Sequence, residues 1–271
     1  MNASTLLDAD YMFNGLSKLV SVNFNSLENL DSAVKMFYNC TSLTSFNYDL
    51  PKIKTATNMF AYCASLSSFN CSTLESLTSA AYMFEKCSNL KTFNTPLPKL
   101  SYGYAMFRNT PISEFTVSLH NLGNGSYMFN DCKNLESFTS GSLASLHTAQ
   151  YMFYGCSKLT AFEISNTSNL SDATGMFSGC SSLETFNGDC SSIIRYACNM
   201  FQGCKLNKES VQRIADTLPT YQPPTKKSED VNKPGNITIH VNKSLPQEDL
   251  DYIKSLFNTI KEKGWTVNTN I

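Results

Sequence analysis

The stretch that decides the fold is Ala149-Gln-Tyr-Met-Phe-Tyr-Gly-Cys-Ser-Lys-Leu-Thr-Ala-Phe162, because variants of it recur along most of the chain. Its Met-Phe pair occurs nine times, at intervals of 22 to 24 residues. The methionines of these pairs are Met12, Met36, Met59, Met83, Met106, Met128, Met152, Met176 and Met200. A fixed period of this length predicts a solenoid, in which one structural unit stacks on copies of itself.

Other positions repeat in step with Met-Phe. Ala or Gly stands three residues before each Met: Ala9, Ala33, Ala56, Ala80, Gly103, Gly125, Ala149, Ala173 and Ala197. Cys stands four residues after Met in seven repeats: Cys40, Cys63, Cys87, Cys132, Cys156, Cys180 and Cys204. A second Phe row comprises Phe46, Phe69, Phe93, Phe115, Phe138, Phe162 and Phe186. One coil cannot bury its own apolar side, so stacking is needed to form continuous rows. Each buried side chain then contributes roughly 1.5–3 kcal/mol.

The pattern predicts an α/β repeat solenoid of about nine coils. Segments such as Thr44–Tyr48 are compatible with short strands, and we expect them to form one parallel β-sheet along one face. The apolar residues of Ala80–Cys87 fit a helical turn or two, so short helices are expected on the other face. The Ala/Gly row is expected where backbones approach closely.

These units resemble the BspA-like leucine-rich repeats of bacterial surface proteins. The related signature reads roughly Met-Phe-x-x-Cys-x-x-Leu-x-x-Leu; here Phe162 replaces the second Leu, and Ala149 stands where the family has another Met. The resemblance covers residues 9–206. It implies a leucine-rich-repeat fold and a non-catalytic solenoid used in adhesion or partner binding. Phages encode similar chains, so the resemblance also allows a virion attachment role.

The pattern ends after Cys204, and we divide the chain into a solenoid, residues 1–206, and a C-terminal capping unit, residues 207–271. The capping unit is predicted to contain a helix at 208–218 with Asn207 as N-cap, an exposed loop at 221–235, and a strand at 237–241. A helix at 246–263 and a strand at 265–269 follow. Its strands are expected to extend the sheet. No equivalent cap is visible before Ala9. The alternative function is therefore that of a structural or assembly subunit, including a virion component, whose open N-terminal edge stacks on another chain, such as a second copy, or on a missing upstream region.

Composition argues against several classes of partner. Net charge is −1 and only 16% of residues are charged, so nothing draws the chain to nucleic acid. No apolar run of 18 residues exists, so membrane insertion is not expected. The N-terminus lacks the features of a secretory signal. The chain is then either cytoplasmic or virion-borne, or a piece of a longer exported protein at the cell surface.

Catalysis, cofactors and metals are not expected either. The three histidines share no spacing, and no nucleophile-elbow, phosphate-loop or dinucleotide motif is present. Cys-x-x-Cys is absent. Leu16 and Thr110 occupy the Cys slot in two repeats, which favours cysteines acting as small buried hydrophobes. Disulfides between adjacent coils are the alternative, although parallel side chains would strain them.

Two sets of residues are candidates for binding a protein or glycan. The first is the polar row after each strand: Asn23, Asn47, Asn70, Asn94, Thr116, Thr139, Glu163 and Asn187. Successive side chains of a strand point to opposite faces of the sheet. This row and the residues before each strand Phe are therefore expected on the solvent face. The row is either simply solvated, an Asn ladder that stabilises the sheet, or a flat docking surface of low charge. The second set comprises Tyr11, Tyr38, Tyr62, Tyr82, Tyr127, Tyr151 and Tyr154, which serve either packing between helices or recognition.

Overall fold

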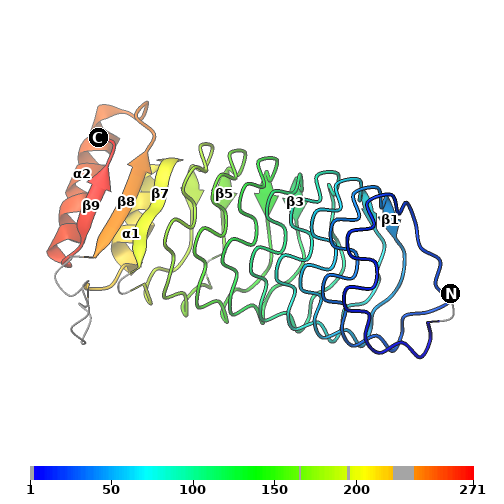
Figure 1. The fold of residues 1–271 in the computed structure, drawn as a ribbon. Coiled ribbons are helices and arrows are strands. Elements are labelled where there is room, and N and C mark those ends of the chain that lie inside the picture. Colours follow the sequence, from blue (N-terminus) through cyan, green and yellow to red (C-terminus); the bar gives the residue numbers. More distant parts are fainter. Residues whose placement is uncertain (1–2, 165, 194–195, 222–234) are drawn as a thin grey trace, which may run out of the picture.

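The computed structural model describes residues 3–164, 166–193, 196–221 and 235–271. The chain forms an elongated stack of coils, with the N-terminus at one end and a unit of helices and strands at the other (Figure 1). Its buried apolar side chains make one continuous cluster that runs from Ala3 to Trp265. The prediction of a repeat solenoid is confirmed.

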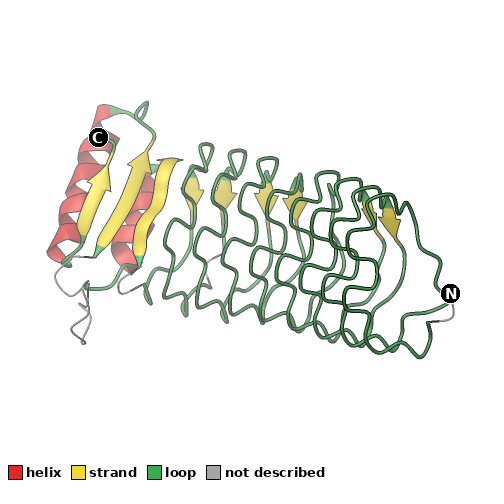
Figure 2. Cartoon of the chain, in the orientation of Figure 1, coloured by secondary structure: helices red, strands yellow, loops and turns green. Residues whose placement is uncertain are grey.

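Short parallel strands follow one another along one side of the stack (Figure 2). They are β1 Ser45–Phe46, β2 Ser68–Phe69, β3 Glu114–Phe115, β4 Ser137–Phe138, β5 Ala161–Phe162 and β6 Thr185–Phe186. They pair only two by two, β1 with β2, β3 with β4 and β5 with β6. The prediction of one continuous sheet is therefore wrong. We call this side, with the residues directly before and after each strand Phe, the strand face.

The rings of the second Phe row stack across paired and unpaired junctions alike. Ring centroids lie 5.7 Å apart between Phe46 and Phe69, and 6.4 Å apart between Phe93 and Phe115. Neighbouring strands in a sheet lie about 4.8 Å apart. The unpaired junction between Phe69 and Phe93 and the paired junction between Phe115 and Phe138 have the same centroid distance, 5.8 Å. Ring spacing alone therefore does not decide where the strands pair.

The opposite side, which carries Met-Phe, contains no helix in the described residues before Lys208, so the predicted short helices are wrong. Tyr82 and Lys86, within the segment Ala80–Cys87, have φ of 57° and 56°. An α-helix needs φ near −60°. The equivalent residues, directly before Met and three residues after it, have positive φ in every one of the nine repeats. The segment is a succession of tight turns, with a left-handed residue at the position that type II turns require.

These turns also join the coils. The N–H groups of Tyr82 and Phe84 donate to the carbonyls of Tyr104 and Met106 in the next coil, each at 2.8 Å. The N–H of Met83 instead donates back to Ala80 within its own coil, at 3.1 Å. A helix would use all of these donors internally and leave the coils joined by side chains alone. We call the segment from the Ala/Gly row to the Cys row the turn ladder.

Two columns of Phe rings form the centre of the core. The Met-Phe rings from Phe13 to Phe201 stack with centroids 5.2–5.7 Å apart and interplanar angles of 13° or less. The second Phe row meets them edge to face, as between Phe115 and Phe129, at 4.9 Å and 68°. Both arrangements are favourable for aromatic quadrupoles. The coils are thus held in register by stacking along each column and by edge contacts between columns.

The Ala/Gly row is restricted by methionine. A Cβ added to Gly103 would lie 3.1 Å from Leu122 Cδ1 and 3.2 Å from Met128 Sδ. At Gly125 the nearest atom would be Met152 Sδ, at 3.0 Å. The row was expected at a close approach of backbones. At these two positions the side chain of Leu122 and the Met side chain of the following coil limit residue size.

The C-terminal unit contains β7 Ala197–Leu206, α1 Lys208–Thr217, β8 Asn236–Val241, α2 Gln247–Glu262 and β9 Thr266–Thr269. Apart from β7, these elements lie within one residue of the bounds that the sequence predicts. Asn207 caps α1, since its Oδ1 accepts the Ser210 N–H at 2.9 Å. Most of the predicted loop at 221–235 falls at 222–234, outside the described residues. The domain division after residue 206 stays a prediction.

The cap strands continue the turn ladder, not the strand face as expected. β7 contains the ninth Met-Phe pair, and the parallel sheet has the order β7-β8-β9. On the strand face α1 covers β6 instead. The N–H of Phe186 donates to Ser210 Oγ at 2.8 Å, and the N–H of Cys190 donates to Thr217 Oγ1 at 3.2 Å. Side chains of α1 therefore supply acceptors that a further coil would otherwise provide.

His240 has the same role at the end of the turn ladder. The N–H of Gly179 donates to the carbonyl of Gln202 in the next coil, at 2.7 Å. Gly203, one coil later, donates instead to His240 Nδ1, at 3.0 Å. Burial, and to a smaller extent the charge of Lys243, lowers the pKa of His240 below its usual value. The low pKa keeps Nδ1 unprotonated, as an acceptor must be.

We expect Phe129→Ala to lower the free energy of unfolding by about 3–5 kcal/mol. Phe129 is fully buried and stacks on Phe107 and Phe153, whereas Phe13 is partly exposed and stacks on Phe37 alone. Phe13→Ala should therefore lower the free energy of unfolding by a clearly smaller amount. Urea denaturation followed by circular dichroism measures both losses, and equal losses would contradict this account of the core.

Acidification should remove the stabilisation that neutral His240 provides. Because the folded-state pKa lies below the ordinary 6.5, the unfolded chain binds a proton first as pH falls. The contribution is complete above about pH 6.5 and declines below it. His240→Gln keeps an acceptor but cannot titrate. Urea midpoints at about pH 7.5 and about pH 5.5 should show the natural chain losing stability relative to H240Q. A constant difference between the two proteins would rule the contact out as a pH-dependent one.

Candidate binding surface

The polar row predicted from the sequence lies together on the strand face, directly after the strand Phe positions. All eight of its members are exposed: Asn23, Asn47, Asn70, Asn94, Thr116, Thr139, Glu163 and Asn187. The fold brings them together because each follows a buried or partly buried Val or Phe position in its coil, and the coils stack in step. Their role in binding stays a prediction.

The row is not a continuous Asn ladder. Asn70 Nδ2 donates to Asn47 Oδ1 at 2.8 Å. From Asn70 onward no further side-chain bond joins neighbouring members of the row in the described part of the chain. Most of these amides and hydroxyls are therefore not used to hold adjacent coils together.

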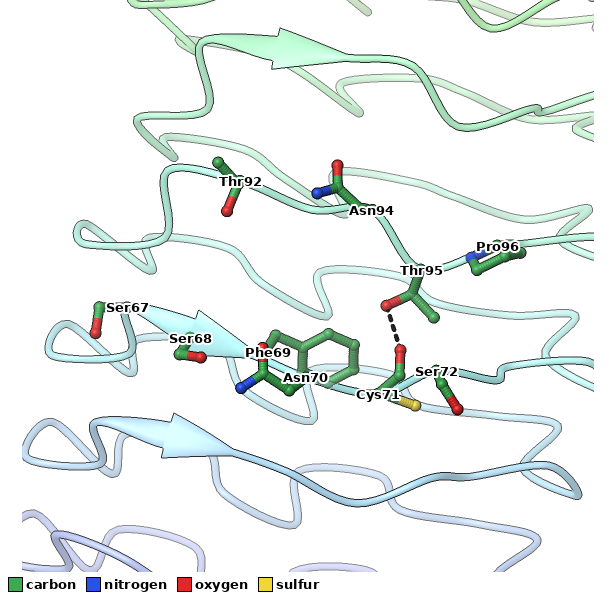
Figure 3. A pocket seen from close by; sticks show the side chains of 10 residues that line it. All are labelled: Ser67, Ser68, Phe69, Asn70, Cys71, Ser72, Thr92, Asn94, Thr95 and Pro96. Atoms are coloured by element: carbon green, nitrogen blue, oxygen red, sulfur yellow. Dashed lines mark hydrogen bonds between the residues drawn. The ribbon is translucent and has the colours of Figure 1, made fainter.

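Three shallow hollows, each of about 400 Å³, lie along the strand face. Residues 67–72, 92 and 94–96 line the one that we call the Asn94 hollow (Figure 3). Residues 138, 139, 141, 142, 163, 164 and 166 line the Glu163 hollow. Residues 25–28, 47–49, 51 and 73 line the Asn47 hollow. Five of the eight predicted residues thus contribute to a hollow: Asn47, Asn70, Asn94, Thr139 and Glu163.

Two of the hollows coincide with interruptions of backbone pairing. At a paired junction the residue after Phe donates its N–H to the preceding Phe carbonyl, as Asn70 does to Phe46 at 2.8 Å. Among the described residues, the equivalent bonds from Asn94 to Phe69 and from Glu163 to Phe138 are absent. Each of these pairs lines a hollow. Both hollows therefore contain a backbone donor and a backbone acceptor that the fold does not pair with each other.

These hollows were not predicted from the sequence. At the Asn94 hollow, Thr95 Oγ1 donates to the Cys71 carbonyl at 2.7 Å and links the two coils in place of the missing backbone bond (Figure 3). Pro96, which has no N–H, was an available signal that pairing would fail nearby. At the Glu163 hollow the signal was Gly141, whose φ is +70°.

The second candidate set, the tyrosines, lies on the turn ladder. Tyr82, Tyr104, Tyr127 and Tyr151 contact one another from coil to coil, with ring centroids 5.2–5.4 Å apart. The Arg108 guanidinium lies 5.6 Å from the Tyr82 ring centroid. The predicted packing between helices does not occur, because this segment contains turns. The rings instead pack between the turns of successive coils, and this packing stabilises the stack. The rings stay partly exposed, and recognition by them stays a prediction.

The cysteines are thiols that act as hydrogen-bond donors, with no disulfide among them. In the seven Cys-row coils, each Sγ donates to the carbonyl of a Met-Phe phenylalanine in the preceding coil, as Cys156 does to Phe129 at 3.1 Å. Burial raises the pKa of the Cys132 thiol to about 12. Thr110 suits the same slot because its hydroxyl donates to Phe107 at 2.7 Å. The size requirement was predictable from the sequence, but this hydrogen bond was not.

No group of three or more His, Cys, Asp or Glu within the described ranges is placed to hold a metal ion. No helix among those residues is long and apolar enough to cross a membrane.

The arrangement defines a leucine-rich-repeat solenoid with one polar face. Comparison with family models matches the chain to the BspA type leucine rich repeat region, in six copies over residues 9–136 and 103–222. The chain therefore belongs to the BspA-type leucine-rich repeat family. No curated protein matches it.

A leucine-rich repeat protein from Bacteroides ovatus, known from its crystal structure, is similar in fold. The TM-score is 0.52 at 19% sequence identity, over 89% of this chain. The match covers 59% of the Bacteroides chain, so the present chain spans less than two thirds of that protein.

Proposed function

We propose that this protein is a non-catalytic binding module that presents its strand face to a protein or glycan partner. The observation that carries the proposal is the row of eight exposed polar residues, five of which line hollows on a single face. The resemblance found in the sequence implies adhesion at a bacterial surface or on a virion, and both settings suit such a module.

The chemistry of the strand face favours a partner of low charge. The polar row and the residues before each strand Phe include two charged residues, Glu114 and Glu163, and no Lys or Arg. Repeat solenoids present extended surfaces of this kind to their partners. Their amides and hydroxyls offer both hydrogen-bond donors and acceptors.

Replacing Asn47, Asn70 and Asn94 together by Lys should weaken ligand binding at least roughly tenfold, because it puts three positive charges on a face of low charge. Binding is measured on arrays of glycans and surface proteins and then by titration. The matched control carries Lys at Asn39, Asn109 and Gln202, which are exposed on the turn-ladder side. Lys86 already occupies the left-handed turn position of Asn39 and Asn109. Equal binding by both variants, with folding intact, would reject the proposal.

A second function, assembly through the N-terminal edge, is favoured by the first coil. Leu7, Leu16 and Val20 are 64%, 48% and 56% exposed. The carbonyls of Asp10 and Met12 accept no backbone N–H from the described residues, whereas the equivalent carbonyls of the second coil accept from the first. This edge of the turn ladder offers acceptors, so two copies cannot pair through it edge to edge. We infer that association would be head to tail, with a donor-bearing surface as partner.

Leu16→Lys with Val20→Lys should abolish concentration-dependent association, because both side chains lie exposed at that edge. Sedimentation velocity over a wide concentration range measures it. The Asn39, Asn109 and Gln202 variant again serves as control and should associate like the natural chain. A chain that is monomeric at every concentration would remove this second candidate.

A further inference from the structure

We propose that the Asn94 hollow binds one sugar unit of a neutral glycan. This inference rests on the proposed function of the strand face and narrows it to one ligand class at one place. The hollow lies between the third and fourth coils, beside β2, where backbone pairing is interrupted (Figure 3).

The side chains that line this hollow are neutral. Asn70 and Asn94 contribute amides, Ser68 and Thr92 contribute hydroxyls, and no Lys, Arg, Asp or Glu is among the lining residues. An anionic ligand such as a phosphate, a sialylated glycan or an acidic peptide would find no cation here. Desolvating its charge would then be unfavourable.

The backbone of the hollow favours hydroxyl groups. Phe69 and Asn94 both line the hollow, and no hydrogen bond joins the Phe69 carbonyl to the Asn94 N–H. A hydroxyl donates and accepts at once, so one or two adjacent hydroxyls can satisfy both groups. An extended peptide would need a continuous row of such pairs, as a sheet edge provides. Here β1 and β2 are already paired on one side of the hollow, and residues 92–94 on its other side belong to no strand.

The hollow also has an apolar wall. Phe69 is only partly buried, unlike the other six members of the second Phe row, which are 4% exposed or less. Its ring stacks between those of Phe46 and Phe93, with ring centroids 5.7 and 5.8 Å away. Pro96 is exposed and also lines the hollow. Together they offer apolar contact for the C–H groups of a sugar ring, next to the polar groups that its hydroxyls require.

The test uses the full chain on an array of neutral hexose oligosaccharides in gluco, manno and galacto configurations, with sialylated and uronic-acid-containing oligosaccharides beside them. The strongest binder is then titrated by calorimetry. The variant Asn70→Ala with Asn94→Ala removes both amides. The control variant, Asn14→Ala with Asn89→Ala, removes two exposed amides outside every hollow described above. Ala61 already occupies the turn position of Asn14. Urea midpoints show that all of the proteins are folded.

We expect binding to a neutral oligosaccharide that weakens at least roughly tenfold in the N70A/N94A variant and changes less than about twofold in the control. Binding of acidic glycans alone, binding that both variants retain, or no glycan binding would overturn the inference. A protein ligand that is lost only in the Lys variant of the strand face would overturn it too, but would leave the proposed function standing. If no ligand loses affinity when the strand face is substituted, both the proposed function and this inference fail.

Discussion

The structure depends on like residues stacking on like residues from one coil to the next. Rings of the Met-Phe column repeat at 5.2–5.7 Å, and turn-ladder N–H groups such as that of Phe84 reach the carbonyls of the following coil. Neither contact exists within a single coil. A coil alone would expose both faces of its stacked rings and the turn donors that reach the next coil, so stability is a property of neighbours. This is why both ends of the stack need special treatment, which α1 and His240 supply at the C-terminal end.

The period of the sequence was enough to predict the solenoid, its buried rows and most elements of the cap, because burial depends on side-chain identity. It was not enough to predict the backbone of the Met-Phe segment. The apolar residues of Ala80–Cys87 fit a helix and a chain of turns equally well. The residues that adopt positive φ are Tyr, Lys, Asn, Asp and Ala as well as Gly, so composition gave little warning. Cross-coil hydrogen bonds decide between the two conformations, and they are invisible in one repeat.

The candidate site was also predictable only in part: its exposed residues were, and its hollows were not. Alternation around each strand Phe placed the eight polar residues on one exposed face, as the structure has them. The hollows were not predictable from the pattern, because the same repeat occurs at junctions that pair and at junctions that do not. Pro96 and Gly141 mark two unpaired places, but only the three-dimensional arrangement shows that a hollow results.

Because every junction repeats the same contacts, the length of this molecule can change by whole coils with little effect elsewhere. After loss or duplication of one complete unit, the coils at the new junction would still stack Phe on Phe, and a Cys thiol would still donate to a Phe carbonyl. The capping elements would not change. A shift by a fraction of a unit would place ring against turn and interrupt the core. The length of the solenoid, and so the distance over which it can contact a partner, can therefore change in evolution by recombination between repeats.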